Sequence, residues 1–372
     1  MQKPNDPSVV EHQANSRVFS IMKGLAIICV VAGHTDFAPV RDFVYLFHLA
    51  VFYFSAGYFF KDRYVHEKGL FIWKRIKGLW FPFWGYGLAF LLLHNVFYRL
   101  HLYPASDHLY MAPDYLKGVA RLFIGEAGNW LLTPLWFVRS LFVASVVFFA
   151  ILVVCKRVFK NKRAVYCEVA AGVCALALAA AVQSDWLDRL PISVPLVKLT
   201  LQRDFAIVPV LFIGRWFRMC QAKVPLSGLC WAAALVLLLA CQWAGVRVEI
   251  SAGEYPPLWL FFAISALGCY FVYLTAHYLH RFSFYGLVAY AGRYSFAVMA
   301  LHLLFFKLVS LSQMLVYGYG WDALGAWPVI DVRTGIWWLP YTVVGTLAPL
   351  GYVWMKERLT PRGLSAARRT KG

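Results

Sequence analysis

Charged side chains are scarce in this chain of 372 residues: Asp, Glu, Lys and Arg make up 15%, whereas hydrophobic residues make up 61%. A water-soluble protein of this composition would lack the polar residues that cover a solvated surface, so the sequence indicates a polytopic membrane protein. Among the charged residues, Asp and Glu are fewer than Lys and Arg, and this excess of basic residues gives a net charge of +18. These basic residues lie between apolar segments and do not line one polar face, which argues against nucleic acid as a partner.

The sequence also lacks the patterns of a metal site, a cleaved signal peptide and a repeat protein. The eight cysteines show no zinc-ligand spacing and lie in apolar segments or at their ends, so we expect neither a metal site nor a disulfide framework. Residues 1–16 are polar and carry no cleavage-site pattern, so the apolar segment that follows is expected to act as an uncleaved signal-anchor. We find no internal repeat and no separate soluble domain.

Apolar runs of membrane-spanning length predict an all-α, polytopic membrane fold with about ten transmembrane helices. We therefore divide the chain into an N-terminal tail over 1–16, a transmembrane domain over 17–356 and a basic C-terminal tail over 357–372. The predicted helices lie near residues 17–36, 43–60, 78–98, 132–155, 164–183, 200–217, 225–245, 257–276, 293–312 and 335–355.

Loop charges predict the orientation of these helices. Lys and Arg concentrate in alternate loops, and the remaining loops hold most of the loop acids. The positive-inside rule therefore places both termini in the cytoplasm. On the opposite side, an amphipathic stretch from Tyr115 to Ile124 is expected to lie on the membrane surface. Residues 313–334 there are rich in Tyr, Trp and Gly, which is typical of an interfacial aromatic belt and also suits stacking on sugar rings.

Lys23 and His34 lie eleven positions apart in the first apolar segment, RVFSIMKGLAIICVVAGHTDF. A buried charge in hydrocarbon costs several kcal/mol, so we expect these two residues to have a structural or functional role. Eleven residues make about three helical turns, which puts both side chains on one face, about 16 Å apart along the axis. Lys23 would then lie near the cytoplasmic surface and His34 in the outer half of the membrane. Snorkelling of Lys23 to the interface is the simpler interpretation.

Further ionisable residues fall at middle and outer depths of the predicted helices. Taken singly, a membrane histidine commonly bonds a neighbouring helix, and Arg203 with Asp204 can form a structural ion pair. Together the residues indicate a site, because intramembrane ionisable residues usually mark one. The set comprises His34, His48, Arg139, Arg203, Asp204 and His302.

A basic cluster precedes the third predicted helix on the cytoplasmic side. Lys74, Arg75 and Lys77 lie in FIWKRIKGLWFPFW between Trp73 and Trp80. The cluster can determine topology and contact anionic lipid headgroups, or it can bind phosphates together with Lys23.

Read together, these segments resemble the acyltransferase-3 family, the ten-helix membrane O-acyltransferases of bacterial surface glycans. The resemblance covers most of the chain, in sequence order from 17 to 310. Two positions depart from the family pattern: Ser20 stands where an acid is common, and Ala56 stands where a Ser usually precedes Gly57. The matching motifs are Lys23-GLAIICVVAG-His34, His48-LAVFYFSAGY, Lys74-Arg75-IKGLWFPFW, LWFVRSLF around Arg139 and YSFAVMALH ending at His302.

The resemblance implies transfer of an acyl group, usually acetyl, from cytoplasmic acyl-CoA to a sugar hydroxyl of a lipid-linked or surface glycan. It implies a multi-pass protein of the bacterial cytoplasmic (inner) membrane, with membrane lipids and other polysaccharide-assembly proteins as further partners. Acyl-CoA would be a substrate, with no permanently bound cofactor and no metal. The expected binding contacts are Lys23, Lys74, Arg75 and Lys77 for acyl-CoA, and Trp136, Ser55, Arg203 and Asp204 for the acceptor.

Within this hypothesis, His34 is a general base on the acceptor hydroxyl or a transient acyl carrier. His48 and His302 would orient it or relay protons, and Arg139 would stabilise an oxyanion. Two other classes stay open: a sugar or amino acid transporter or a polysaccharide-binding membrane module, and a haem-binding bundle that uses His34, His48 and His302.

Overall fold

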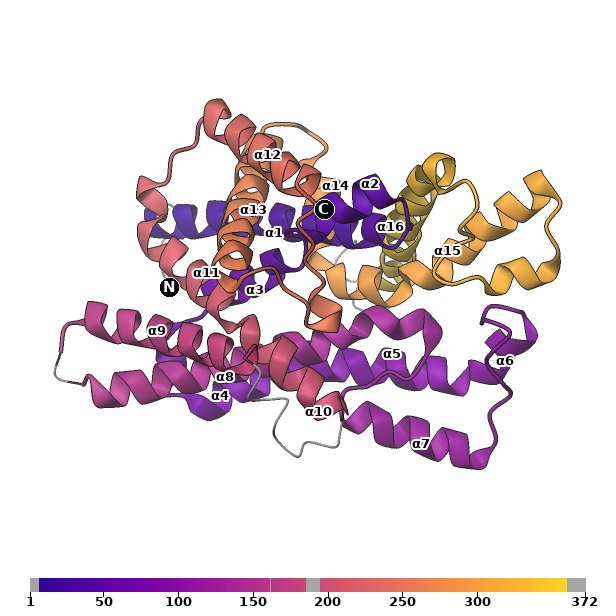
Figure 1. The fold of residues 1–372 in the computed structure, drawn as a ribbon, viewed down its shortest axis with the longest axis horizontal. Helices are drawn as coiled ribbons and strands as arrows, with labels where there is room; N and C mark the ends of the chain where they lie inside the picture. The colour runs from indigo at the N-terminus through magenta and orange to yellow at the C-terminus, as the bar shows by residue number, and fades with distance from the viewer. Residues whose placement is uncertain (1–6, 161, 185–194, 360–372) are drawn as a thin grey trace, which may run out of the picture. The chain divides into compact units, whose positions relative to one another are not determined.

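The computed structural model describes residues 7–160, 162–184 and 195–359 (Figure 1). These residues form helices joined by turns and contain no β-strand; one isolated β-bridge pairs Glu249 with Glu254. The predicted all-α fold is confirmed for this part of the chain. The predicted tails fall partly outside the described residues, while α1 begins at Pro7 and α16 ends at Leu359.

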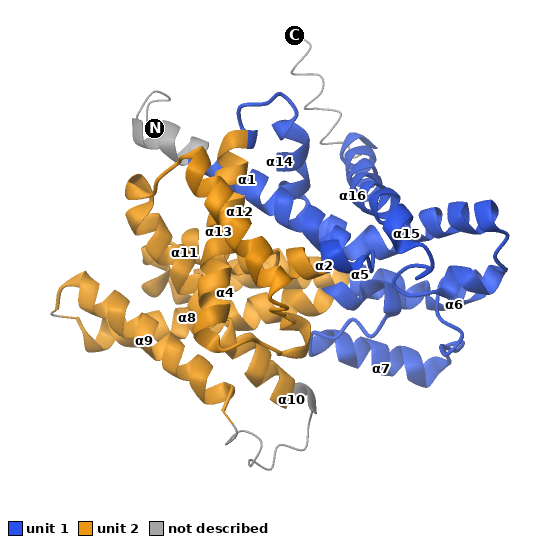
Figure 2. Ribbon diagram, turned by 45° about the horizontal axis from the view of Figure 1, so that its top comes forward, with its two compact units in different colours: residues 1–41, 86–134, 279–372 blue, residues 42–85, 135–278 orange. Residues whose placement is uncertain are grey.

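The chain folds as two compact units, each assembled from segments that are distant in sequence (Figure 2). Unit 1 comprises residues 1–41, 86–134 and 279–372, and unit 2 comprises residues 42–85 and 135–278. The chain passes from one unit to the other at four points, which lie in α2 (Ala38–Tyr45), α5 (Phe81–Leu92), η3 (Trp130–Leu135) and α13 (Leu258–Leu279).

Unit 1 is built on α1, which packs against three helices from the C-terminal third of the sequence. The contact with α14 is close because Gly24 faces the backbone of Val288, where a β-carbon would lie 1.9 Å from the carbonyl oxygen. Small residues allow such approaches between membrane helices. The elements of unit 1 are α1 (Pro7–Gly33), α6 (His94–Arg99), α7 (Ala112–Phe123), η3 (Trp130–Leu135, mostly in this unit), α14 (Tyr285–Arg293), α15 (Ser295–Tyr317), η8 (Trp321–Gly325) and α16 (Thr334–Leu359).

Unit 2 has two central contacts, between α3 and α11 and among α8, α9 and α11. Gly57 of α3 lies against the backbone of Leu211, where any larger residue would clash. The elements of unit 2 are α3 (Ala50–Tyr58), η1 (Asp62–Val65), α4 (Lys68–Arg75), η2 (Ile76–Trp80), α8 (Trp136–Val158), α9 (Ala164–Val182), α10 (Pro195–Thr200), η5 (Leu201–Phe205), α11 (Val208–Cys220), η6 (Gln221–Lys223), α12 (Gly228–Trp243), η7 (Ile250–Ala252) and α13 (Leu258–Leu279).

Five helical segments among the described residues are long and apolar enough to cross a membrane. The predicted count of about ten spans and the cytoplasmic termini stay predictions. The five are Asn15–Gly33, Trp130–Val158, Ala164–Val182, Leu258–Leu279 and Ser295–Tyr317.

Several of the other predicted spans are interrupted helices. Residues 46–49 form a turn between α2 and α3, within the helix predicted near 43–60. The helix predicted near 200–217 consists of a π-helix, η5, and then α11, which has Pro209 in its first turn. A second π-helix, η2, comes just before Pro82. Proline lacks an N–H and clashes with the carbonyl four residues earlier, so both irregular segments lie where regular α-helical bonding is disfavoured.

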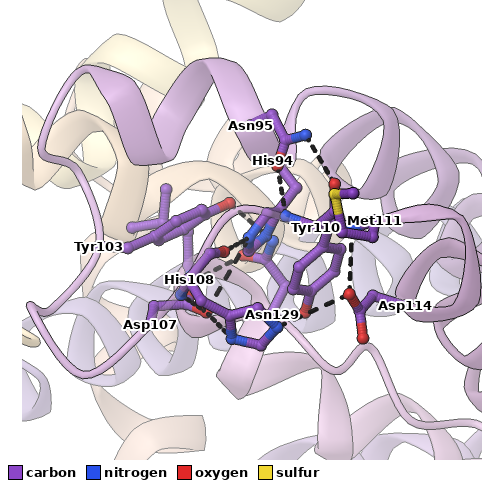
Figure 3. A network of polar contacts seen from close by, with 10 residues as sticks. His94, Asn95, Tyr103, Asp107, His108, Tyr110, Met111, Asp114 and Asn129 are labelled. Atoms are coloured by element: carbon purple, nitrogen blue, oxygen red, sulfur yellow. Dashed lines mark hydrogen bonds and ion pairs between the residues drawn. The ribbon is translucent and has the colours of Figure 1, made fainter.

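A polar network folds the segment between α6 and α8 (Figure 3). The His94 ring stacks on Tyr110, with ring centroids 3.4 Å apart, and the side chain of Asn95 exchanges two hydrogen bonds with the Tyr110 backbone. Asp114 accepts from the Met111 N–H at the start of α7, which holds the pKa of this carboxyl below its ordinary value. Helix α7 covers most of the predicted amphipathic stretch, with Leu116 and Phe123 exposed.

Candidate functional site

The imidazoles of His34 and His302 lie side by side in unit 1, with ring centroids 5.0 Å apart and an interplanar angle of 52°. The sequence predicted His34 inside the first helix, but α1 ends at Gly33 and His34 begins the following turn. His34 is half-buried, whereas His302, in the middle of α15, is 0% exposed. The two residues thus form a pair in which one ring is partly accessible and the other is enclosed.

Hydrogen bonding assigns a role to each nitrogen of these rings. Nδ1 of His34 lies 2.8 Å from the Val30 carbonyl oxygen, and Nδ1 of His302 lies 3.0 Å from the Val298 carbonyl oxygen. A carbonyl only accepts, so Nδ1 must carry the proton and donate in both residues. In a neutral imidazole the lone pair then lies on Nε2. Nε2 of His302 is buried and has no hydrogen-bond partner among the described residues.

Aromatic and polar groups continue from His302 toward the end of α15. Phe306 packs edge-on against His302 and against Tyr341 of α16. The Tyr341 hydroxyl lies 2.9 Å from Ser310 Oγ and donates to Gln313 Oε1 at 3.1 Å. The buried residues of this face thus run from the imidazole pair to the segment that joins α15 and α16.

Lys23 lies in α1 on the N-terminal side of His34 and is partly buried. The helix is continuous from Lys23 to Gly33, so the rise of about 1.5 Å per residue places the two residues about 16 Å apart along the axis, as predicted.

In unit 2, Arg203 and Asp204 form a buried ion pair within the π-helix η5. Arg203 Nε donates to Asp204 Oδ1 at 2.6 Å, and its guanidinium lies 4.6 Å from the ring centroid of Trp136. The Tyr255 hydroxyl donates to the backbone carbonyl of Arg203 at 3.1 Å, and burial raises the pKa of Tyr255 well above its ordinary value. Three of the four predicted acceptor contacts therefore do cluster, around a charge pair that burial makes expensive to break.

Other predicted residues lie elsewhere in unit 2. His48 is buried in the turn between α2 and α3, with Nδ1 2.7 Å from the Val44 carbonyl oxygen. Arg139 is buried in α8, one turn after Trp136. Ser55 is buried in α3, and its hydroxyl makes no hydrogen bond with the described residues.

The predicted basic cluster spans the junction of α4 and η2. Lys74 and Lys77 are exposed and Arg75 is half-buried. Lys74 Nζ lies 3.4 Å from the Tyr64 hydroxyl and above that ring, while the Arg75 guanidinium lies over Phe71. Two exposed ammonium groups and a partly shielded guanidinium can together bind an anion such as a phosphate.

The chain was compared with protein-family models to find the family to which it belongs. The model of the acyltransferase-3 family, described as an acyltransferase domain, matches residues 18–355. The chain belongs to the acyltransferase-3 family. Together with its long apolar helices, membership identifies a multi-pass membrane acyltransferase. Searches of curated proteins and of solved structures found no match.

Sequence reasoning missed two features of this acyltransferase. Lys307, in the middle of α15, is 3% exposed and donates to two backbone carbonyls, those of Leu324 and Ala326, at 2.9 and 2.7 Å. In unit 2, Arg215 donates to both oxygens of Glu168 at 2.8 and 2.6 Å and to Asp62 at 2.8 Å. The signal was available in both cases, because Lys307 and Glu168 each stand inside an apolar run.

No cluster of three or more metal-ligating side chains occurs among the described residues.

Proposed function

We propose that this acyltransferase is an O-acetyltransferase that moves an acetyl group from cytoplasmic acetyl-CoA to a sugar hydroxyl of a lipid-linked or cell-surface glycan. The observation that carries the proposal is the pair of His34 and His302, in which a partly accessible imidazole has its Nδ1 occupied by a carbonyl. A neutral ring held in this tautomer offers a lone pair on Nε2, as a general base requires.

In the proposed step, Nε2 of His34 accepts the proton of the sugar hydroxyl while the hydroxyl oxygen bonds to the thioester carbonyl carbon. The carbon–sulfur bond then breaks, and the departing thiolate takes the proton back from the imidazolium. The products are the sugar ester and the CoA thiol, with no further reactant. Alternatively, Nε2 attacks the thioester first and carries the acyl group, which ping-pong kinetics would reveal.

In this mechanism, His302 holds the ring of His34 in position. Its buried ring packs against the His34 ring, which restricts how that ring can turn. A base must be held within a fraction of an ångström of its productive position to reach its full effect. His48 would orient groups or relay protons within unit 2, where its Nδ1 is likewise held by a helix carbonyl.

The donor is proposed to bind through its phosphates and to extend through its pantetheine arm. Its several negative charges cannot enter hydrocarbon at low cost, whereas the arm is thin and mostly uncharged. The phosphate contacts proposed from the sequence are Lys23, Lys74, Arg75 and Lys77. About 16 Å separate Lys23 from His34 along the helix axis, a span that the arm can cover.

The acceptor is proposed to contact the cluster around Arg203 and Asp204. The Arg203 guanidinium lies over one face of the Trp136 ring, so the opposite face is the one proposed to stack on a sugar ring. The ion pair would supply donors and acceptors to the sugar hydroxyls. Ser55 and Arg139 complete the proposed set, with Arg139 stabilising the negative charge of the developing oxyanion.

We further propose that the protein resides in a bacterial cytoplasmic (inner) membrane with both termini inside. Loop charges support this orientation. Membrane lipids and other polysaccharide-assembly proteins are its proposed partners.

Radiolabelled acetyl-CoA and a panel of short oligosaccharides, added to the reconstituted protein, test the function. We expect wild-type protein to label a sugar, and His34→Ala to reduce labelling by about 10²- to 10⁴-fold, the usual contribution of a general base. His66→Ala, which removes an exposed loop histidine, is the control. Unchanged turnover in His34→Ala would refute the assignment, and sugar uptake into vesicles without labelling would identify a transporter.

A further inference from the structure

The segment that joins α15 to α16 is folded and is bonded to side chains of α15. We call residues 318–333 the cap segment. Lys307 reaches it from inside α15, and its ammonium donates to the carbonyls of Leu324 and Ala326. Burying an ammonium in a membrane helix is costly, and two charge-assisted hydrogen bonds offset part of that cost.

Three further contacts hold the cap segment in place. Gln313 Nε2 donates to the Val332 carbonyl at 2.8 Å, so side chains of α15 bond both the middle of the segment and its C-terminal end. Met314, Leu324 and Ile330 form a small buried core beneath it. Gly325 lies against the Tyr103 backbone, where a β-carbon would be 2.5 Å from the carbonyl oxygen. The cap segment is thus fixed from several sides.

This attachment places the cap segment at the end of unit 1 where His34 lies. Helix α15 carries His302, which contacts His34, as well as Lys307 and Gln313, which hold the cap segment. The helix that follows the cap segment, α16, stacks Trp338 on Phe37, with ring centroids 5.9 Å apart. Phe37 is only three residues beyond His34. Helix α15 therefore contacts both the imidazole pair and the cap segment, and α16 contacts the segment that follows His34.

The exposed side chains of the cap segment suit a sugar. Trp321 is 67% exposed, and the carboxylate of its neighbour Asp322 is 96% exposed. Trp327 stands edge-on to Trp130, and its indole N–H donates to the Trp130 carbonyl at 2.9 Å. Aromatic faces stack on sugar rings, and carboxylates accept from sugar hydroxyls. The exposed carboxylate beside the indole is costly to bring toward hydrocarbon, which argues against membrane anchoring at this position.

We infer that the cap segment is an acceptor subsite for a glycan, with Trp321 and Asp322 as contacts and Lys307 as the positioning residue that holds it. This inference rests on the proposed transfer to a sugar hydroxyl. It assigns the segment from 318 to 333 to substrate recognition, whereas an interfacial aromatic belt would serve only to anchor the protein in the bilayer.

Steady-state kinetics of paired variants test the inference. Trp321→Ala is compared with Trp243→Ala, which removes a 93% exposed indole at the end of α12. Lys307→Met is compared with Lys356→Met, which removes an exposed ammonium at the other end of α16. Acceptor KM, acetyl-CoA KM, kcat and acceptor-free acetyl-CoA hydrolysis are measured with whichever oligosaccharide of the panel is acetylated.

We expect Trp321→Ala and Lys307→Met to raise acceptor KM about tenfold, which corresponds to about 1.4 kcal/mol. Acetyl-CoA KM and hydrolysis should stay unchanged, as should all constants of the two control variants. The inference is wrong if Trp321→Ala and Trp243→Ala change acceptor KM by the same factor, or reduce membrane insertion to the same extent. The cap segment would then be part of an interfacial aromatic belt. Because Trp321 is exposed, this arm remains decisive even if Lys307→Met fails to fold.

Direct binding separates failure of the inference from failure of the proposed function. Saturation-transfer NMR measures binding of the same oligosaccharides to the protein without turnover. Binding that Trp321→Ala weakens, in a protein that acetylates no sugar, would refute the O-acetyltransferase and support the subsite. Acetylation that Trp321→Ala leaves unaffected would support the O-acetyltransferase and refute the subsite.

Discussion

His34 and His302 come from opposite ends of the sequence, yet their rings lie 5.0 Å apart within unit 1. Each Nδ1 already donates to a carbonyl of its own helix, so each ring can gain a proton only on Nε2. Two imidazolium ions at this distance would repel each other in a low-dielectric surrounding. We therefore expect the pair to accept one proton at a time, as a single base does.

Removing the enclosed ring should weaken catalysis without abolishing it. We expect His302→Ala to lower kcat about a hundredfold, the size of effect that a misplacement of about 1 Å can cause. Acetyl-CoA KM should change little, and the pH dependence of kcat should shift because His34 loses its neighbour. Steady-state kinetics over a range of pH measure both. A variant with wild-type kcat and an unshifted profile would remove His302 from the mechanism.

Lys23→Ala should weaken donor binding most. Loss of one charge-assisted contact to a phosphate is expected to raise acetyl-CoA KM about tenfold, equivalent to about 1.4 kcal/mol. Lys356→Ala, at an exposed position in the same unit, is the matched control. A change in acceptor kinetics alone would show that Lys23 does not contact the donor.

The charge network of unit 2 should be cooperative. Arg215→Met leaves Glu168 buried without its main partner, so we expect a loss of about 3 kcal/mol in the free energy of unfolding. Replacing both residues by Met should recover much of that loss, because no uncompensated charge remains. Unfolding titrations of the single and double variants in detergent measure the coupling. Strictly additive losses would contradict a coupled pair.

Asp62 should contribute to stability in a defined pH range. Burial alone would raise its pKa, but hydrogen bonds from Lys156 and Arg215 outweigh this and lower the pKa to about 2. A carboxyl with a lowered pKa stabilises the fold above its unfolded pKa of about 3.9, and that contribution disappears as the pH falls toward 2. Solvent screening of this half-exposed carboxylate keeps the effect modest.

The comparison of wild type with Asp62→Asn tests this sign. The melting temperatures in detergent should differ by a constant amount above about pH 5, where the carboxylate is ionised in both states. The difference should shrink below about pH 4. A difference that grows on acidification would show that the ion pairs do not form.

The sequence predicted the helical class from its apolar runs. It pointed to candidate residues because charged and strongly polar side chains are costly to place in hydrocarbon and therefore stand out there. Lys23, His34 and His302 stand out for that reason, and α1 is continuous from Lys23 to Gly33, the residue before His34. The proximity of His34 to His302 was not predictable, since it depends on how α1 and α15 pack. The role of Lys307 was hidden in the same way, because its partners are backbone carbonyls without a sequence signature.

Helix boundaries were predicted less well. Apolar runs do not reveal where a helix widens or breaks, and the turn at 46–49 and the π-helices at Ile76–Trp80 and Leu201–Phe205 all lie inside or at the edge of predicted spans. Pro82 and Pro209 marked two of these places. The ion pair of Arg203 and Asp204 lies in one of these π-helices, and Lys77 of the basic cluster lies in the other.

Because His34 Nδ1 donates to the Val30 carbonyl, the tautomer and orientation of the His34 ring depend on the last turn of α1. The carbonyl belongs to the last turn of α1, where it also accepts from the His34 backbone N–H at 3.3 Å. If that turn unwound, the ring would lose its fixed tautomer together with its orientation, and the proton could settle on either nitrogen. If His34 has the proposed role of general base, a ligand or lipid that unwinds Val30–Gly33 would therefore stop acyl transfer without contacting the imidazole.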